Sequence, residues 1–221
     1  MGQKVNPIAL RLGGHQDFAS IGYYSKKMYP KIILQDIRIR ELLYKRLKQA
    51  GVGKIIVERS VSAIKITIYV VRPGIVIGRG GSGLEEIKKM ILQMLFEVGK
   101  VDRENGRDDK NHPRVELKVE PIKEPNLSAY LVASNISDQL MRRMPFRRIM
   151  KQSIEKVMGS GAKGVRIVLA GRINGAEIGR RERLQVGKVS LSTIREDIDY
   201  ASVPSLTKSG YIGVKVWIDK G

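Results

Sequence analysis

The glycine-rich turn at residues 73–95 constrains the fold of this chain more than any other stretch. It reads P-G-I-V-I-G-R-G-G-S-G-L-E-E-I-K-K-M-I-L-Q-M-L, so that Gly78, Arg79, Gly80 and Gly81 separate a short apolar run from a helix-patterned one. Glycine has no Cβ and tolerates positive φ, and N–H groups at the start of a helix can face a phosphate. The turn therefore predicts the close approach of a phosphate-bearing ligand.

The net charge of the chain limits which class of ligand can supply that phosphate. Its 221 residues include 41 Lys and Arg against 22 Asp and Glu, a net charge of +19, while 42% of the residues are hydrophobic. This is the composition of a folded protein, and its length predicts two domains. A positive excess of this size is usually neutralised by a polyanion, either nucleic acid or an anionic membrane.

The scarcity of cysteine and histidine excludes many kinds of catalytic and metal site. The chain has no cysteine, and its two histidines are His15 and His112, which excludes disulfides, thiolate zinc sites and most histidine-based catalysis. No apolar run approaches the ~20 residues of a membrane span, and the first residues are too polar for a signal peptide. We therefore predict no catalytic residues, no metal, no cofactor and no membrane partner, in a protein made in the cytosol or inside an organelle.

Periodicity in the first half predicts an arm followed by a unit of order αββααβ. Pro7, Gly13 and Gly14 break any long element in residues 1–30, which we interpret as an extended arm that docks elsewhere. The polar stretch 102–112 has the composition of an inserted loop. The expected elements are a helix over 35–50 with Ile39, Leu42, Leu43 and Leu47 inward, strands over 54–59 and 64–71, a helical turn over 75–77, a helix over 84–98 and a strand over 115–122.

The second half predicts two helices packed on a four-stranded sheet. Glu124, Pro125 and Asn126 mark a domain boundary, and Pro145 suits the first turn of a helix because that turn does not use the missing N–H. The expected elements are helices over 127–144 and 145–159 and strands over 164–170, 176–184, 197–206 and 211–218. The predicted fold class is α+β, with one domain at 31–123 and a two-layer α/β domain at 124–221.

The glycine turn has two functional interpretations. Gly78, Gly80 and Gly83 match the dinucleotide-binding pattern G-x-G-x-x-G, but Pro73 and Gly74 separate the turn from the strand before it. The acids about twenty positions further on, Asp102 and Glu104, lie in a polar loop before the next strand begins. A G-x-x-G turn between two helices in the order αββααβ is instead typical of the type II KH domain, whose turn holds single-stranded nucleotides by their backbone. A glycine turn needed only for packing stays open as the alternative.

Several spaced motifs extend the resemblance from a KH domain to a whole family. The motifs are M-G-Q-K-V-N-P with Arg11 at the start, R-P-G-I-V-I-G at 72–78, A-K-G-V-R-I at 162–167, G-R-I-N-G-A-E-I-G-R at 171–180, D-I-D-Y at 197–200 and G-V-K-V-W-I at 213–218. With these motifs the chain resembles the S-three family, the KH-containing ribosomal proteins of the small-subunit head. Its turn holds one cation, Arg79, where relatives often have two, so we expect a weaker grip on RNA.

The resemblance implies a structural RNA-binding constituent of the small ribosomal subunit. Its implied partners are small-subunit rRNA, mRNA and neighbouring head proteins, and its implied location is the ribosome in the cytoplasm, with an organellar origin left open. The family lines the entrance of the mRNA channel, and its basic helix there matches residues 141–151. By position, Arg147, Arg148 and Lys151 correspond to the cations implied in gripping mRNA and helping to unwind it.

The residues support a basic helix on their own terms. Arg143, Arg147 and Lys151 recur at i, i+4 and i+8, Arg142 and Arg148 lie beside them, and no acid occurs between positions 140 and 153. On a helix such a stripe projects several cations to one side, where arginine forks bind phosphates without reading sequence. The alternative is an ordinary solvated helix face.

A second basic surface is expected on the terminal sheet, with rRNA as its partner. Strand cations can also pair with Glu177, Glu182, Asp197 and Asp199. Asp197 and Asp199 share a strand face at i, i+2, but without a histidine or a third acid they do not make a metal nuclease. An RNA-processing enzyme or an oxidoreductase is therefore the disfavoured alternative. The expected rRNA-binding residues are Arg166, Arg172, Arg180, Arg181, Arg183 and Lys188, with Lys4 and Arg11 from the arm.

Overall fold

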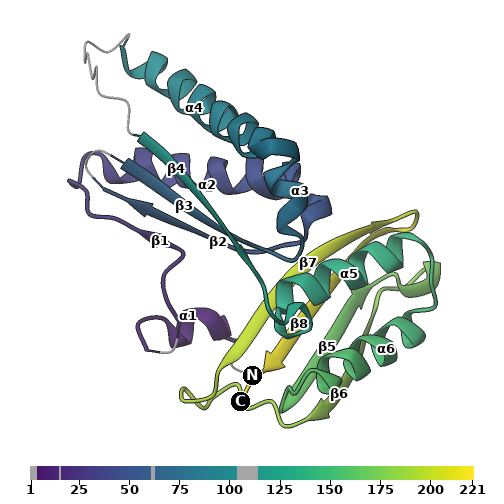
Figure 1. The fold of residues 1–221 in the computed structure, drawn as a ribbon. Helices are drawn as coiled ribbons and strands as arrows, with labels where there is room; N and C mark the ends of the chain where they lie inside the picture. The colour runs from purple at the N-terminus through teal and green to yellow at the C-terminus, as the bar shows by residue number, and fades with distance from the viewer. Residues whose placement is uncertain (1–3, 15, 61–62, 104–113) are drawn as a thin grey trace. The chain divides into compact units, whose positions relative to one another are not determined.

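The computed structural model describes residues 4–14, 16–60, 63–103 and 114–221, and it divides the chain into two compact units (Figure 1). One unit is Phe18–Lys123, and the other combines Met1–Asp17 with Glu124–Gly221. Most of the loop expected at 102–112 lies outside the described residues. None of the helices in the described ranges is long and apolar enough to cross a bilayer.

The first unit has the predicted order αββααβ. A short strand, β1 (Ser20–Ile21), precedes these elements and pairs with β2. The sheet order is β1-β2-β3-β4, with β2 and β3 antiparallel and the two outer pairs parallel. The elements are α2 (Tyr29–Arg46), β2 (Val52–Arg59), β3 (Ala63–Val70), α3 (Pro73–Ile77), α4 (Ser82–Arg103) and β4 (Arg114–Pro121), with single 3-10 turns at Lys48–Ala50 and Arg79–Gly81.

Helix α2 packs the predicted apolar face against this sheet. Ile39, Leu43 and Leu47 are buried, and Leu42 is half-buried. The helix begins at Tyr29, earlier than the predicted position 35, because Pro30 occupies its first turn, where proline is tolerated. On β3, Ile64, Ile66, Ile68 and Val70 are all at most 1% exposed and complete the core from the sheet.

The second unit has the predicted two helices on a four-stranded sheet. The sheet order is β6-β5-β8-β7, and every neighbouring pair is antiparallel. Strand β6 begins later than predicted, because Asn174 and Gly175 adopt positive φ in a 3-10 turn, Ile173–Gly175, that precedes it. The elements are α5 (Ala129–Met141), α6 (Phe146–Gly159), β5 (Gly164–Gly171), β6 (Arg180–Gly187), β7 (Ile198–Thr207) and β8 (Gly210–Asp219).

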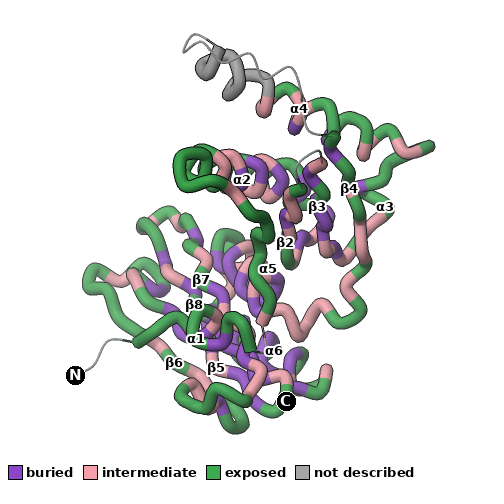
Figure 2. Tube along the Cα trace, turned by 90° about the vertical axis from the view of Figure 1, so that its left-hand side faces the viewer, coloured by how far each residue is buried: buried purple, intermediate pink, exposed green. Residues whose placement is uncertain are grey.

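Helices α5 and α6 lie together on one face of the second sheet, which we call the helix face (Figure 1). The main core forms between them, with Val165, Ile167 and Leu169 supplied by β5. The opposite face, which we call the outer face, has a smaller cluster of Val168, Trp217 and other residues near the loop between β6 and β7. Figure 2 shows the buried residues concentrated where helices and sheet meet.

The arm differs from the expected extended segment. Residues Pro7–Arg11 form a short helix, α1, because Pro7 fits its first position and the Asn6 side chain accepts the Ile8 N–H at 3.0 Å. The arm also divides between the two units, since residues up to Asp17 belong with the C-terminal sheet. Ser20 instead pairs with Val57 in the first sheet.

Candidate nucleic-acid interface

The glycine turn opens between α3 and α4 with a sharply turned backbone. Gly78, Gly80 and Gly81 all have positive φ, at 71°, 62° and 84°. The N–H of Gly78 donates to the Gly74 carbonyl at 3.0 Å and ends α3, and the Ser82 hydroxyl donates to the Arg79 carbonyl at 3.0 Å. A Cβ at Gly80 or Gly81 would meet no atom within 4 Å, so this part of the turn faces open space.

Gly83 has a different role, which sequence reasoning did not find. A Cβ on Gly83 would lie 2.5 Å from the Val76 carbonyl oxygen, far inside any real contact. Gly83 therefore lets the start of α4 press against the end of α3. A Cβ on Gly78 would lie 3.0 Å from the Gly83 nitrogen, so Gly78 belongs to the same close contact. The packing alternative thus applies to Gly78 and Gly83, while Arg79–Gly81 remain accessible to a ligand.

Apolar side chains flank the open part of the turn. Ile75 and Ile77 are 49% and 39% exposed, whereas Val76 between them is 1% exposed and packs in the core. The predicted apolar run therefore anchors α3 by one residue and presents the other two to solvent. Exposed apolar groups beside backbone N–H donors suit a nucleotide, whose base is apolar on its faces and whose phosphate is charged.

The expected i, i+4, i+8 stripe of cations starting at Arg143 is broken in the structure. Arg142 ends α5, Arg143 has a φ of 61°, and α6 begins only at Phe146. Pro145 causes the break, because its ring cannot continue a helix and it disfavours helical backbone in the residue before it. Arg142 and Arg143 are exposed, but they belong to the turn between two helices and not to one helical face.

The first turns of α6 carry the remaining cations of that stripe. Arg147, Arg148 and Lys151 are exposed and line a shallow surface pocket together with Gln152 and Glu155. Sequence reasoning stopped at position 153 and so missed the carboxylate of Glu155 at the C-terminal side of the pocket. Arg147, Arg148 and Lys151 form a compact basic patch near the start of the helix, which we call the α6 patch.

Phe146 connects the α6 patch to the sheet. Its ring is 4% exposed, and the guanidinium carbons of Arg147 and Arg180 each lie 5.7 Å from its centroid. Cations over an aromatic face are attracted to it, so one ring holds an arginine from α6 and an arginine from β6 in place. Arg180 therefore joins the α6 patch, although the sequence grouped it with the sheet.

Strand alternation places other sheet cations on the outer face. Arg181 and Arg183 alternate with Glu182 along β6, so the arginines lie on one face and the glutamate on the other. In register across the sheet, Arg183 neighbours Val168 of β5, and Val168 in turn neighbours Lys215 of β8. Lys215 was not predicted, although its alternation with Val214 and Val216 was a readable signal.

Lys4 and Arg166 belong to the same outer-face group. Burial, and then the nearby charges of Arg166, Arg181, Arg183 and Lys215, lower the pKa of Lys4 below its ordinary value. Burial first and Arg183 second also lower the pKa of Arg166. Arg166 Nε donates to Gln185 Oε1 at 2.9 Å, and Arg183 donates to the same oxygen. These like charges crowd one another and would gain from a bound polyanion.

Arg11 was expected to contact rRNA, and the structure corrects that expectation. Its side chain is 1% exposed, and within the described residues its hydrogen bonds all go to backbone carbonyls. The acceptors are the carbonyls of Glu196 (2.7 Å), Thr193 (2.7 Å), Pro7 (3.0 Å), Leu191 (3.2 Å) and Ser190 (3.4 Å). Arg11 thus fastens the arm to the loop between β6 and β7 and is not available to RNA.

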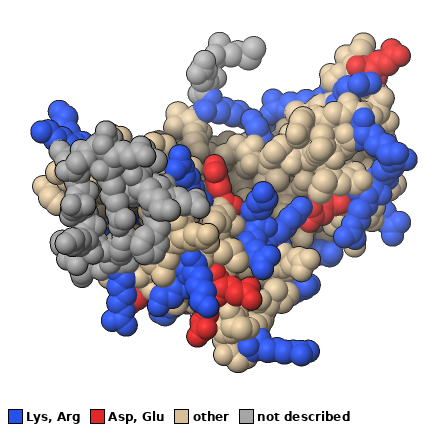
Figure 3. Space-filling view, turned by 90° about the horizontal axis from the view of Figure 1, so that it is seen from above, with Lys and Arg blue, Asp and Glu red and all other residues tan. Residues whose placement is uncertain are grey.

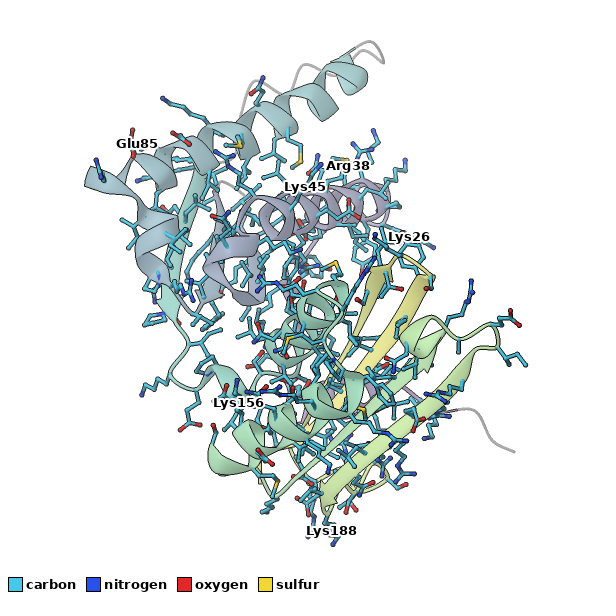
Figure 4. All side chains as sticks on the ribbon, turned by 90° about the vertical axis from the view of Figure 1, so that its right-hand side faces the viewer. Lys26, Arg38, Lys45, Glu85, Lys156 and Lys188 are labelled. Atoms are coloured by element: carbon cyan, nitrogen blue, oxygen red, sulfur yellow. The ribbon has the colours of Figure 1, made fainter. Side chains whose placement is uncertain are left out.

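Arg172 and Lys188 complete the set of expected sheet cations. Arg172 is exposed, but its guanidinium donates to the carbonyls of Ala176 (2.8 Å) and Ser209 (3.3 Å), which ties the turn before β6 to the β7–β8 hairpin. Lys188 follows β6, is exposed and points away from the ribbon (Figure 4). Lys and Arg side chains spread widely over the face drawn in Figure 3, with Asp and Glu in small groups between them.

The acidic pair considered as a metal site makes contacts within the protein. Asp199 accepts the Ala129 N–H at 2.9 Å at the start of α5 and lies 3.6 Å from the Lys220 ammonium. Asp197 precedes β7, and its carbonyl accepts the Lys220 N–H at 3.0 Å. Among the residues with described positions, no three potential ligands gather into a metal site.

Known proteins match both halves of the chain. The model of the KH domain family matches residues 38–127, and that of the ribosomal protein S3 C-terminal domain matches 136–218. The small ribosomal subunit protein uS3 of Hahella chejuensis is 45% identical over 100% of this chain and 90% of its own length. The uS3 proteins of Caldanaerobacter subterraneus (42% over 100% and 93%) and Methylacidiphilum infernorum (43% over 99% and 95%) are similarly related.

These relatives have the names of ribosomal proteins and not of enzymes, which confirms the predicted family and the predicted non-enzymatic class. The dinucleotide and nuclease interpretations are therefore set aside. A match over the full chain at more than 40% identity, with a family model on each half, leads to one conclusion. The chain belongs to the uS3 family of small ribosomal subunit proteins.

Proposed function

We propose that this protein binds rRNA as a structural constituent of the small ribosomal subunit and contacts mRNA where it enters the channel. Its partners are small-subunit rRNA, mRNA and neighbouring proteins of the subunit head, and its location is the ribosome. The single observation that carries the mRNA contact is the α6 patch, in which Arg147, Arg148 and Lys151 line one shallow pocket.

The α6 patch has the chemistry for gripping an RNA backbone. Arginine forks bind phosphate oxygens bidentately, and such contacts hold a strand without reading its sequence, as a moving message requires. Arg180 strengthens the patch, because the Phe146 ring holds it beside Arg147. Fixed cations that bind a single strand as it leaves a duplex favour the opened state, which is how the patch would aid unwinding.

The glycine turn supplies a second proposed contact, with rRNA. Gly80 and Gly81 expose their backbone to open space, and Arg79 adds one cation beside them. The outer-face cations Arg166, Arg181 and Arg183, together with Lys4, supply a third contact. Arg172 and Lys188 border the same sheet.

The α6 patch is tested by replacing its cations together. We expect the triple variant Arg147→Ala, Arg148→Ala, Lys151→Ala to slow translation of an mRNA with a stable hairpin more than translation of an unstructured mRNA. Assembly should stay near normal, because these side chains are exposed and their loss leaves no cavity. The measurement is the elongation rate on matched messages, with subunit content checked by sedimentation in a salt-washed gradient.

Lys156→Ala is the matched control, because Lys156 is also on α6 but does not line the pocket. It should leave both rates unchanged. Equal slowing of both messages by the triple variant would contradict a contribution to unwinding. A protein that sediments only as free chain would contradict the ribosomal function itself.

A further inference from the structure

Neither α5 nor α6 lies over the outer face of the C-terminal sheet, although the short helix α1 contacts β7. Helices α5 and α6 both pack on the helix face. Residues of the loop between β6 and β7 pack with Trp217 at one end of the outer face. Beyond Trp217, Lys215 and Ser202 are exposed in neighbouring positions of β8 and β7. A sheet face without a long helix over it and without a continuous apolar surface is suited to a polar partner.

Strand alternation places most of the cations and most of the carboxylates of these strands on opposite faces of the sheet. Arg181, Arg183 and Lys215 project from the outer face, and Glu182 and Asp199 fall on the helix face. Asp219 is the acid of β8 with outer-face alternation, but it is 2% exposed at the covered end of the sheet. The exposed part of the outer face is therefore cationic without an intervening carboxylate on these strands.

The row that begins at Arg181 is flat beyond that side chain. Ala170, Gly213 and Pro204 are neighbours in register across β5, β8 and β7, and none has a long side chain. A Cβ on Gly213 would make only an ordinary contact, 3.7 Å from the Ala170 carbonyl oxygen, so packing does not require glycine there. Because Gly213 has no side chain, nothing projects from the sheet at this position, and a ligand can lie across the strands.

Exposed apolar side chains occupy the next row. Tyr211 and Leu206 are paired in register and are 69% and 57% exposed. Tyr211 has the same alternation as Lys215 and lies about 13 Å from it along β8, at ~3.3 Å per residue. An aromatic ring thus stands at one side of the flat row, Arg183 and Lys215 stand at the other side, and Arg181 lies at the end of the row.

We propose that the outer face binds a short single-stranded RNA segment, with Arg181, Arg183 and Lys215 on its phosphates and Tyr211 stacked on an unpaired base. The inference deepens the proposed rRNA contact of this sheet and rests on it. Combined cations and aromatic rings are typical of single-strand binding, because every base has a face that can stack. A duplex would offer phosphates but would keep its base faces covered.

The test uses the full chain with Gly80→Asp and Gly81→Asp, so that the glycine turn contributes little. Binding of a labelled RNA of about ten nucleotides is measured by fluorescence anisotropy, as a single strand and as a duplex. We expect Tyr211→Ala to weaken single-strand binding by about 5- to 100-fold and to leave duplex binding nearly unchanged. Tyr211→Phe should bind like the parent, because it retains the ring.

Cations and controls complete the design. Lys215→Ala should weaken both forms and reduce the slope of log affinity against log salt by about 0.7 for the single strand. Tyr23→Ala is the matched control, because Tyr23 is 99% exposed in the other unit and should not matter. Circular dichroism melts check that each variant is folded.

The outcomes separate this inference from the function on which it rests. If the parent chain binds neither RNA, the proposed rRNA binding fails. If the parent binds but Tyr211→Ala and Lys215→Ala bind equally well, only the outer-face inference is overturned. Equal loss of single strand and duplex in Tyr211→Ala would overturn the stacking. Loss of a neighbouring subunit protein from purified subunits, without any loss of RNA affinity, would show a protein interface instead.

Discussion

The two domains form their proposed RNA-binding surfaces by opposite means. In the KH domain the turn depends on missing side chains, because Gly83 lets α3 and α4 approach and Gly80 and Gly81 leave backbone exposed. In the C-terminal domain the surface is made of long side chains on strands, and the buried Arg11 fastens the arm beside it. Each surface therefore depends on one residue that would not touch RNA, Gly83 in one domain and Arg11 in the other.

The largest expected effect comes from removing Arg11. Arg11→Met should destabilise the C-terminal domain by about 3 kcal/mol, because several carbonyls would lose their donors in a buried site. Hydrogen exchange of the amides around 190–196 should rise with it, since these are the residues that Arg11 holds. Chemical denaturation measures the first effect and exchange with mass spectrometry the second.

Arg38→Met is the control, because Arg38 is exposed on α2 of the other domain. It should change stability by less than about 0.5 kcal/mol. Unchanged protection at 190–196 in Arg11→Met would show that the loop keeps its conformation without the arginine. The C-terminal surface would then not depend on Arg11 in the way that the glycine turn depends on Gly83.

A smaller effect is expected from filling Gly83. Gly83→Ala should cost about 1 to 3 kcal/mol, although alanine normally favours a helix, because the Val76 carbonyl is backbone and cannot turn away. Gly213→Ala in the C-terminal sheet is the matched substitution and should stay within about 0.5 kcal/mol, since its Cβ has room. Equal melting shifts for the two alanine variants would contradict the difference between the domains.

The smallest effect concerns the charge of Lys4. Burial and the neighbouring arginines lower the pKa of its ammonium, so the folded state holds this proton less tightly than the unfolded chain. The charged Lys4 ammonium therefore destabilises the folded state by its full amount when the pH is below the folded-state pKa. This destabilisation disappears as the pH rises past the pKa that Lys4 has in the unfolded chain. Because Lys4 is exposed, the change in stability is small.

The Lys4 titration itself is the sharper measurement. NMR should find the Lys4 pKa below the ordinary lysine value, and Arg183→Ala should raise it by removing one of the charges responsible. Binding of single-stranded RNA should raise it further, because phosphates favour the charged ammonium. A Lys4 pKa that does not respond to Arg183→Ala would place Lys4 away from the outer face.

Periodic features of the sequence predicted the elements well. The alternation of Ile64, Ile66 and Ile68 identified β3, and the helical spacing of Ile39 and Leu43 identified the buried face of α2. These patterns work because a side chain's direction follows from local backbone geometry. The same rule applied to β8 would have revealed Lys215.

Contacts between distant parts of the chain were not predictable in this way. A charge in the sequence indicates exposure, so nothing marked Arg11 as a buried donor to carbonyls some 180 positions away. The apparent stripe from Arg143 to Lys151 crossed the helix break at Pro145, where spacing along the sequence no longer reports direction. The meeting of Arg180 with Phe146 depended on tertiary packing, which no local pattern describes.

The discontinuity of the C-terminal domain sets an order of events during synthesis. Arg11 is made among the first residues, but the carbonyl of Glu196 that it binds follows 185 residues later. At about 5–20 residues per second the arm waits roughly ten to forty seconds for that partner. The KH domain, which lies wholly within this interval, can fold first. A chain truncated before Glu196 would leave the arm unattached, so the contact made by Arg11 can form only after the loop between β6 and β7 has been synthesised.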